Sequence, residues 1–185
     1  MESFDVDTVV VGAHQESSKP GSSENDNSYY AAGAAYVFVR SGSVWSQQAF
    51  LKGSNSWSGD YFGNSVAIDD DTIVVGAYGH GFSYGAAYEG ATYVFTHNGN
   101  IWSQQEYLKA SAPEGHDYFG SSVGVSGANI VVGSSGDSNN TGIAYTYFDA
   151  PFVSSITRAN TDYTYSSTVD FTVNFSEAVT GVDTS

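Results

Sequence analysis

The sequence predicts an all-β fold built from tandem repeats. Three observations lead to this prediction: an internal repeat with an offset of 57 residues, short runs rich in Val, Ile, Tyr and Phe between Gly- and Asp-containing turns, and no segment with helical periodicity. With 21 Gly, 14 Tyr, 11 Phe and only 3 Pro in 185 residues, the composition is typical of short strands and tight turns rather than of a disordered chain.

The repeat is clearest where residues 33–63 align with residues 90–120, because 17 of these 31 positions are identical. The motifs common to both copies are, in order, Gly-Ala-x-Tyr-Val-Phe, Trp-Ser-Gln-Gln, Leu-Lys and Asp-Tyr-Phe-Gly. A second block, Val-Val-Gly-Ala or a close variant, occurs at Val10–Ala13, Val74–Ala77 and Val131–Ser134. Three copies are therefore present, and the first and last are incomplete.

One copy contains four strand signals, at residues 64–69, 72–77, 91–97 and 101–109. The second signal is continuously apolar, which predicts a strand buried on both faces in the middle of a sheet. The fourth mixes aromatic and polar residues and ends at Lys109, the counterpart of Lys52, as expected of an outer strand whose lysine discourages foreign pairing. Repeated units of this kind predict a partial β-propeller of about two to three four-stranded antiparallel blades that cover one another's faces.

We expect the blades to occupy residues 1–150, with repeats at about 1–63, 64–120 and 121–150. The third copy stops after Tyr147, where its fourth strand should begin. Propellers commonly complete a last blade with a strand from the other terminus, so we expect the parent protein to supply one from upstream of Met1. Further blades of the parent chain are therefore expected partners.

Two landmarks carry a resemblance to a known family. Phe62-Gly63-Asn64 followed by Val75-Gly76-Ala77, and again Phe119-Gly120 followed by Val132-Gly133-Ser134, resemble the Phe-Gly and Gly-Ala-Pro landmarks of bacterial FG-GAP (integrin-α-like) repeat proteins. The resemblance covers residues 2–148 and implies a β-propeller in a bacterial secreted or cell-surface protein. Residues 151–185, whose 169–175 segment alternates apolar and polar side chains, resemble the beginning of a bacterial Ig-like β-sandwich domain, truncated because such a domain takes about 100 residues.

Members of this family often hold calcium between the first two strands of a blade. In the second copy that connection is only Asp69-Asp70-Asp71. Calcium takes about 6 to 8 oxygen ligands, and so short a hairpin cannot supply them. We expect a solvated acidic turn here, and the resemblance leaves calcium open at other positions between blades.

Composition and motifs exclude several other functions. A net charge of -15 repels nucleic acid and anionic membranes, and no apolar run approaches the ~20 residues that would insert into a bilayer. The segment Gly120–Gly124 matches the Gly-x-Ser-x-Gly nucleophile pattern, but no helix follows it. The four His have no metal-ligand spacing. We therefore assign no catalytic or metal-binding residue and expect that the protein is not an enzyme.

The copies differ most in their connections. Between the Gly that closes the second strand and the Gly that opens the third lie 20, 13 and 8 residues in successive copies. In an up-and-down sheet these connections share a face with those that lead to the next blade, and variable loops on a rigid scaffold favour ligand binding. The candidate ligand-binding residues on this face are Asp26, Tyr29, Tyr30, Trp57, Tyr84 and Tyr88, with Glu24, Asp60, Phe82 and Glu89 beside them.

Trp57 is the most informative of these residues, because its counterpart in the next copy is Glu114 and the fold therefore does not require an indole there. Aromatic side chains with neighbouring acids suit a glycan or a basic protein ligand. We expect a non-enzymatic recognition or adhesion module, extracellular or on the bacterial cell surface. The alternatives are a structural spacer without a ligand and a propeller-type glycan-active enzyme, and loop aromatics that only shield the blade edges would also explain the composition.

Overall fold

The computed structural model describes residues 7–81, 88–99, 101–137, 141–148, 153–158 and 171–175. All twelve elements within these ranges are β-strands, which confirms the all-β prediction. The chain divides into two compact units, Met1–Phe148 and Asp149–Ser185.

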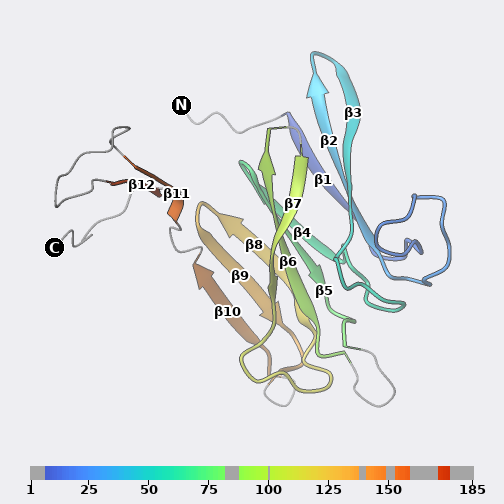
Figure 1. Ribbon diagram of the computed structural model, residues 1–185. Helices are drawn as coiled ribbons and strands as arrows, with labels where there is room; N and C mark the ends of the chain where they lie inside the picture. The colour runs from blue at the N-terminus through green and yellow to red at the C-terminus, as the bar shows by residue number, and fades with distance from the viewer. Residues whose placement is uncertain are drawn as a thin grey trace. The chain divides into compact units, whose positions relative to one another are not determined.

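Three antiparallel sheets form the first unit, and each corresponds to one copy of the repeat (Figure 1). The first sheet contains β1 (Thr8–Ala13), β2 (Ala34–Ser41) and β3 (Val44–Leu51). The second contains β4 (Ser65–Asp69), β5 (Thr72–Ala77), β6 (Ala91–Asn98) and β7 (Ile101–Leu108). The third contains β8 (Phe119–Ser126), β9 (Asn129–Ser134) and β10 (Ile143–Phe148). The four predicted strands of the second copy are thus confirmed to within one residue at each end.

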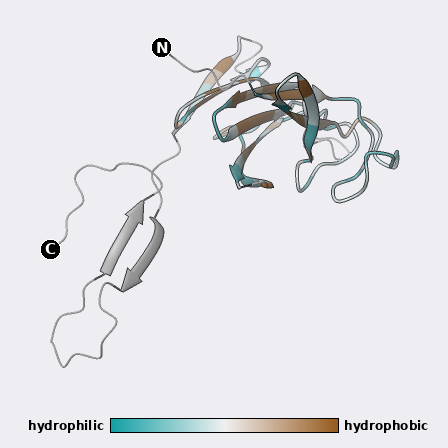
Figure 2. Ribbon diagram, turned by 90° about the horizontal axis from the view of Figure 1, so that it is seen from above, coloured by the Kyte–Doolittle hydropathy of each residue, from teal (hydrophilic) through white to brown (hydrophobic). Residues whose placement is uncertain are grey.

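The middle strand β5 is buried on both faces, as its continuous apolar run predicts. Ile73 and Val75 pack into the hydrophobic cluster shared with the first sheet, whereas Val74 packs into the cluster shared with the third, and all three are fully buried. Alternate side chains of a strand point to opposite faces, so only a strand between two neighbouring sheets needs an apolar residue at every position. Figure 2 shows the hydrophobic residues concentrated along the strands and the hydrophilic ones in the connections.

A phenylalanine at the start of the second blade and another at the start of the third fill the space between neighbouring sheets. Phe62 is fully buried, with its ring in edge contact with Tyr93 at 5.2 Å, and Phe119 makes the same contact with Tyr145 at 5.3 Å. Here the backbones approach so closely that a Cβ on Gly76 would lie 2.0 Å from the carbonyl oxygen of Gly120. The Phe-Gly and Gly-Ala landmarks are therefore residues of the interface between blades.

The Trp-Ser-Gln-Gln motif links the outer strands of two blades through a side-chain hydrogen bond. The Trp102 indole N–H on β7 donates a hydrogen bond of 2.8 Å to the side-chain oxygen of Gln48 on β3. The strand β7 forms the edge of its sheet, as expected. Lys52, however, is not the exposed lysine that was predicted to discourage foreign strand pairing. Its side chain is only 6% exposed and donates to the Glu16 carboxylate at 2.9 Å. Lys109 likewise pairs with Glu89 at 2.7 Å.

The described residues of the second unit form an antiparallel pair of strands, β11 (Val153–Arg158) and β12 (Phe171–Phe175), with an irregular register near Val153. The strand expected at residues 169–175 is present as β12. A single hairpin is common to many β folds, so the Ig-like assignment stays a prediction.

Candidate ligand-binding face

The connections between second and third strands lie beside those that lead to the next blade. The amides of Gly59 and Tyr61 on the β3–β4 connection donate to the carbonyls of Tyr30 and Ala31 on the β1–β2 connection, at 2.9 and 3.1 Å. The Tyr118 amide donates to the Tyr88 carbonyl in the same way at 3.0 Å. We call this end of the sheets the loop face, comprising the described residues 14–33, 52–63, 78–81, 88–90, 109–118, 135–137 and 141–142.

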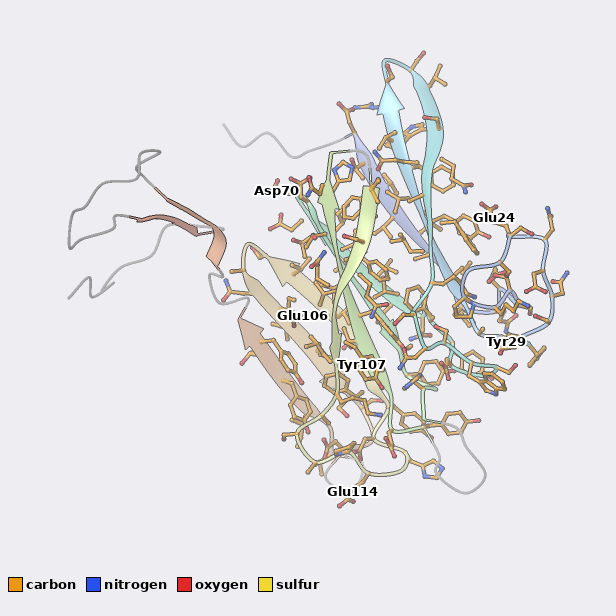
Figure 3. The ribbon with its side chains drawn as sticks, in the orientation of Figure 1. Glu24, Tyr29, Asp70, Glu106, Tyr107 and Glu114 are labelled. Carbon is orange, nitrogen blue, oxygen red and sulfur yellow. The ribbon has the colours of Figure 1, made fainter. Side chains whose placement is uncertain are left out.

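Two of the predicted ligand-binding residues, Tyr29 and Trp57, meet on the loop face, and a third, Tyr30, is the chain neighbour of Tyr29. The Trp57 ring is 4.4 Å from the Tyr29 ring, at an interplanar angle of 58°. Trp57 is 57% exposed and Tyr30, next in the chain to half-buried Tyr29, is 75% exposed. Figure 3 shows Tyr29 and Glu24 on the same long β1–β2 connection. We call Tyr29, Tyr30 and Trp57 the Trp57 cluster.

Asp60 is not an exposed loop residue, which corrects its predicted place on this face. Its residue is only 1% exposed, and its carboxylate accepts the Trp57 amide at 2.7 Å and contacts the His80 ring nitrogen at 2.8 Å. Its counterpart Asp117 accepts the Glu114 amide at 2.6 Å in the same way. An unpaired amide in a buried turn is costly, so this aspartate closes the turn that carries residue 57 or 114.

Asp26 orders the β1–β2 connection rather than offering a free carboxylate. It accepts hydrogen bonds from the amide of Lys19 at 3.2 Å and from the amide and hydroxyl of Ser28 at 3.1 and 2.9 Å. These donors, the Lys19 amide first, favour the ionised form and lower the pKa of Asp26 to about 2. Asp26 therefore supports the segment that carries Tyr29 and Tyr30.

Tyr88 lies apart from the Trp57 cluster, in a second group of rings. Its ring is 5.9 Å from Tyr118 and 6.0 Å from His116. Tyr118 is 6.0 Å from Tyr78, which stacks on Tyr61 at 5.1 Å with an interplanar angle of 3°. The remaining predicted residue, Tyr84, lies outside the described residues, as does Phe82. The His14 ring, 6.2 Å from that of Tyr61, extends this second group. We call the group the tyrosine row, and its members are His14, Tyr61, Tyr78, Tyr88, His116 and Tyr118.

Sequence reasoning missed most of the tyrosine row, although two signals were available. Tyr61 and Tyr118 directly precede the interface phenylalanines, and Tyr78 directly follows the Val-Val-Gly-Ala block. These positions place the rings at the ends of neighbouring inner strands. Burial, and after it the adjacent tyrosines, raise the pKa of Tyr78 above its ordinary value.

Among the described residues, no group of three or more His, Asp or Glu side chains is placed to hold a metal ion. The same ranges contain no helix that is long and apolar enough to cross a membrane. The described part of the loop face presents exposed aromatic rings, tyrosine hydroxyls and carboxylates.

Antiparallel sheets of up to four strands, stacked face to face in chain order, define a partial β-propeller. The FG-GAP repeat profile matches residues 45–95 and 102–147, together more than half of the chain. The chain therefore belongs to the FG-GAP repeat family. Such repeats typically occur in extracellular proteins and in integrin-like recognition and adhesion modules. No curated protein matches the chain.

Proposed function

We propose that this chain is a non-enzymatic recognition or adhesion module of a bacterial secreted or cell-surface protein, and that it binds a glycan or a basic protein through the loop face. The occurrence of FG-GAP repeats in integrin-like recognition and adhesion modules supports this proposal. The net charge of -15 also favours a neutral or basic ligand over an acidic one.

The observation that carries the proposal is the exposure of Trp57. A large apolar ring that is 57% exposed contributes little to folding, and the equivalent position holds Glu114. Its turn is nevertheless held by the buried Asp60 carboxylate, so the ring is presented in a fixed position beside Tyr29. Rigid aromatic side chains with a low entropy cost are the usual anchors of recognition surfaces.

The test is ligand capture by the 185-residue chain on a glycan array and on an array of extracellular proteins. Trp57→Ala and Tyr30→Ala are expected to reduce capture at least about tenfold without changing the thermal unfolding temperature. The matched control is Trp45→Ala, because Trp45 is 45% exposed on β3 at the end of the sheet opposite the loop face.

Three outcomes would contradict the proposal. Equal loss of capture in the Trp45 control would move the site away from the loop face, and no captured ligand on either array would favour a structural spacer. Turnover of a glycan that is abolished by substitution of a single acidic residue would favour an enzyme.

A further inference from the structure

One buried carboxylate oxygen links a histidine to the turn that carries Trp57. Asp60 Oδ2 accepts the Trp57 amide at 2.7 Å, and the same oxygen lies 2.8 Å from His80 Nδ1. The side chains of His80 and Asp60 are only 14% and 2% exposed. The imidazole and the Trp57 turn therefore share one acceptor that water barely reaches.

The backbone holds His80 at this place. The Gly79 amide donates to the Asp60 carbonyl at 3.1 Å, and the Gly90 amide donates to the His80 carbonyl at 2.9 Å. The first bond ties the β5–β6 connection to the β3–β4 connection, and the second closes the β5–β6 connection on itself. The contact of His80 with Asp60 therefore does not depend on the ring alone.

The third blade builds the same turn without an imidazole. Asp117 accepts the Glu114 amide at 2.6 Å, and the Gly136 amide donates to the Asp117 carbonyl at 3.0 Å. The place of His80, the third residue after the second strand of the blade, is taken there by Asp137. The fold therefore does not require a histidine at this place, and the histidine accompanies the turn with the exposed tryptophan.

The surroundings of the two places also differ. The His80 ring contacts the rings of Tyr93 and Tyr107 edge-on at 6.2 and 5.5 Å, and Figure 3 shows Tyr107 on β7. Asp137 instead lines a pocket of about 820 Å³ that also reaches Tyr145 of β10. A charge on His80 is therefore screened by water much less than a charge on Asp137.

The neighbouring hydroxyl decides which ring nitrogen of His80 carries the proton in the neutral state. The Tyr93 hydroxyl lies 3.4 Å from Nδ1, but it donates its proton to the side-chain oxygen of Asn55 at 2.8 Å. The two groups that face Nδ1, this hydroxyl oxygen and the Asp60 carboxylate, are therefore acceptors, and Nδ1 is the donor. A further proton is taken up at Nε2, which makes the ring a cation in contact with Asp60.

The other titratable groups around this contact come from several elements. Burial raises the pKa of Tyr93 on β6, and the charge of Asp60 adds to this shift. Burial also raises the pKa of Tyr107, and the charges of Asp60 and Glu89 add to it. Burial lowers the pKa of Lys52, and the Asp60 charge acts against this shift. Asp60 therefore already interacts with one cation, Lys52, when the imidazole becomes a second.

We propose that His80 is a pH-sensitive positioning residue for the Trp57 cluster. This inference rests on the recognition function stated above and adds its regulation. With a neutral ring at His80, the Asp60 carboxylate holds the turn and the indole is presented in a fixed position. Protonation of the ring draws the shared oxygen toward the imidazolium, loosens the Trp57 amide and weakens ligand binding in acid.

The direction of the effect follows from competition between two donors for one oxygen. A hydrogen bond from an imidazolium to a carboxylate is shorter and roughly twice as strong as one from a neutral donor. The Trp57 amide then bonds to an oxygen of lower electron density. A turn that is less well held loses more conformational freedom when a ligand binds, so the affinity falls.

The experiment follows the backbone amide of Trp57 by NMR in the isotope-labelled full chain, from about pH 8 to about pH 5, where imidazoles ordinarily change charge. The amide proton is expected to shift upfield with the same midpoint as the His80 ring protons. Its protection factor against hydrogen exchange should fall roughly threefold. The Glu114 amide is the internal control, because its acceptor Asp117 has no imidazole in the place of His80.

His80→Asn is the matched variant, because its side-chain amide can still donate to Asp60 but carries no charge. In this variant the Trp57 amide is expected to keep its neutral-pH shift and protection throughout the titration. A ligand captured on the arrays should bind the unsubstituted chain about threefold more weakly at about pH 5.5 than at about pH 7.5, and should bind the variant equally at both.

Four results would overturn the proposal. These are no titration of the His80 ring in this range, an unchanged Trp57 amide while the ring titrates, an equal shift of the Glu114 amide, and a persistent pH response in His80→Asn. The NMR titration needs no ligand, so failure to capture any ligand would contradict the recognition function alone. If His80→Asn does not fold, the comparison of Trp57 with Glu114 in the unsubstituted chain decides the question.

Discussion

Removal of the Phe62 ring tests the interface between the first two blades most directly. Phe62 is fully buried between these sheets, with the rings of Tyr93 and Phe95 in edge contact at 5.2 and 6.1 Å. Truncation of a buried phenylalanine to alanine costs about 3 to 5 kcal/mol through lost apolar burial and the remaining cavity. Because a domain of this size has only about 5 to 15 kcal/mol of stability, Phe62→Ala is expected to remove a large fraction of it.

The assay is equilibrium unfolding in urea, followed by tryptophan fluorescence, with the midpoint and slope fitted together. Tyr30→Ala is the control, because a side chain that is 75% exposed should change the free energy of unfolding by less than about 0.5 kcal/mol. A loss below about 1 kcal/mol in Phe62→Ala would refute the stacked-blade interface. Should that variant not fold, Phe62→Leu gives the same comparison with a smaller expected loss, about 1 to 1.5 kcal/mol.

Three further predictions follow from the same contacts. Gly76→Ala places a methyl group 2.0 Å from the Gly120 carbonyl oxygen and should cost at least about 2 kcal/mol in urea unfolding, whereas Gly124→Ala, with no atom within 4 Å of its Cβ, should be nearly neutral. Gln48→Ala removes the acceptor of the Trp102 indole and should cost about 1 kcal/mol in urea unfolding. Gln105→Ala should cost less, because Gln105 is exposed and its side chain donates to half-buried Ser103 on the same strand. Equal losses would contradict the coupling of outer strands. Because the folded-state pKa of Asp26 is lowered to about 2, its contribution to stability is complete above the unfolded-state pKa near 3.8 and is lost as the pH falls toward 2. A carboxyl NMR titration of Asp26 with its midpoint near pH 4 would contradict this.

The repeated sequence motifs have distinct structural roles. Phe-Gly and Gly-Ala pack one blade on the next, with the glycines required where backbones approach closely. The tryptophan and second glutamine of Trp-Ser-Gln-Gln join outer strands of successive blades. Self-alignment identifies these residues as shared by the copies, but cannot say which blade each one contacts, because the partner lies one repeat away in the chain.

The candidate site was also only partly predictable, because contacts between segments far apart in the chain are not visible in the sequence. Differences between copies singled out Trp57, and the structure places that ring at the surface beside Tyr29. The same reasoning put Asp60 on the surface, although the carboxylate is buried. A polar residue in a loop is predicted to be solvent-exposed unless the hydrogen-bond donors that pair with it are known. One partner of Asp60 is His80, which lies on a different connection.

The sequence by itself determined the strands, their grouping into repeats and the burial of β5 on both faces, because side-chain alternation and turn residues are local properties that recur in each copy. Only the tertiary structure decided which charged groups are paired, which aromatic rings meet and where a pocket remains open on β10. Those outcomes depend on hydrogen-bond donors, rings and strand edges that separate segments bring together. The distances between these groups cannot be predicted from a local sequence pattern.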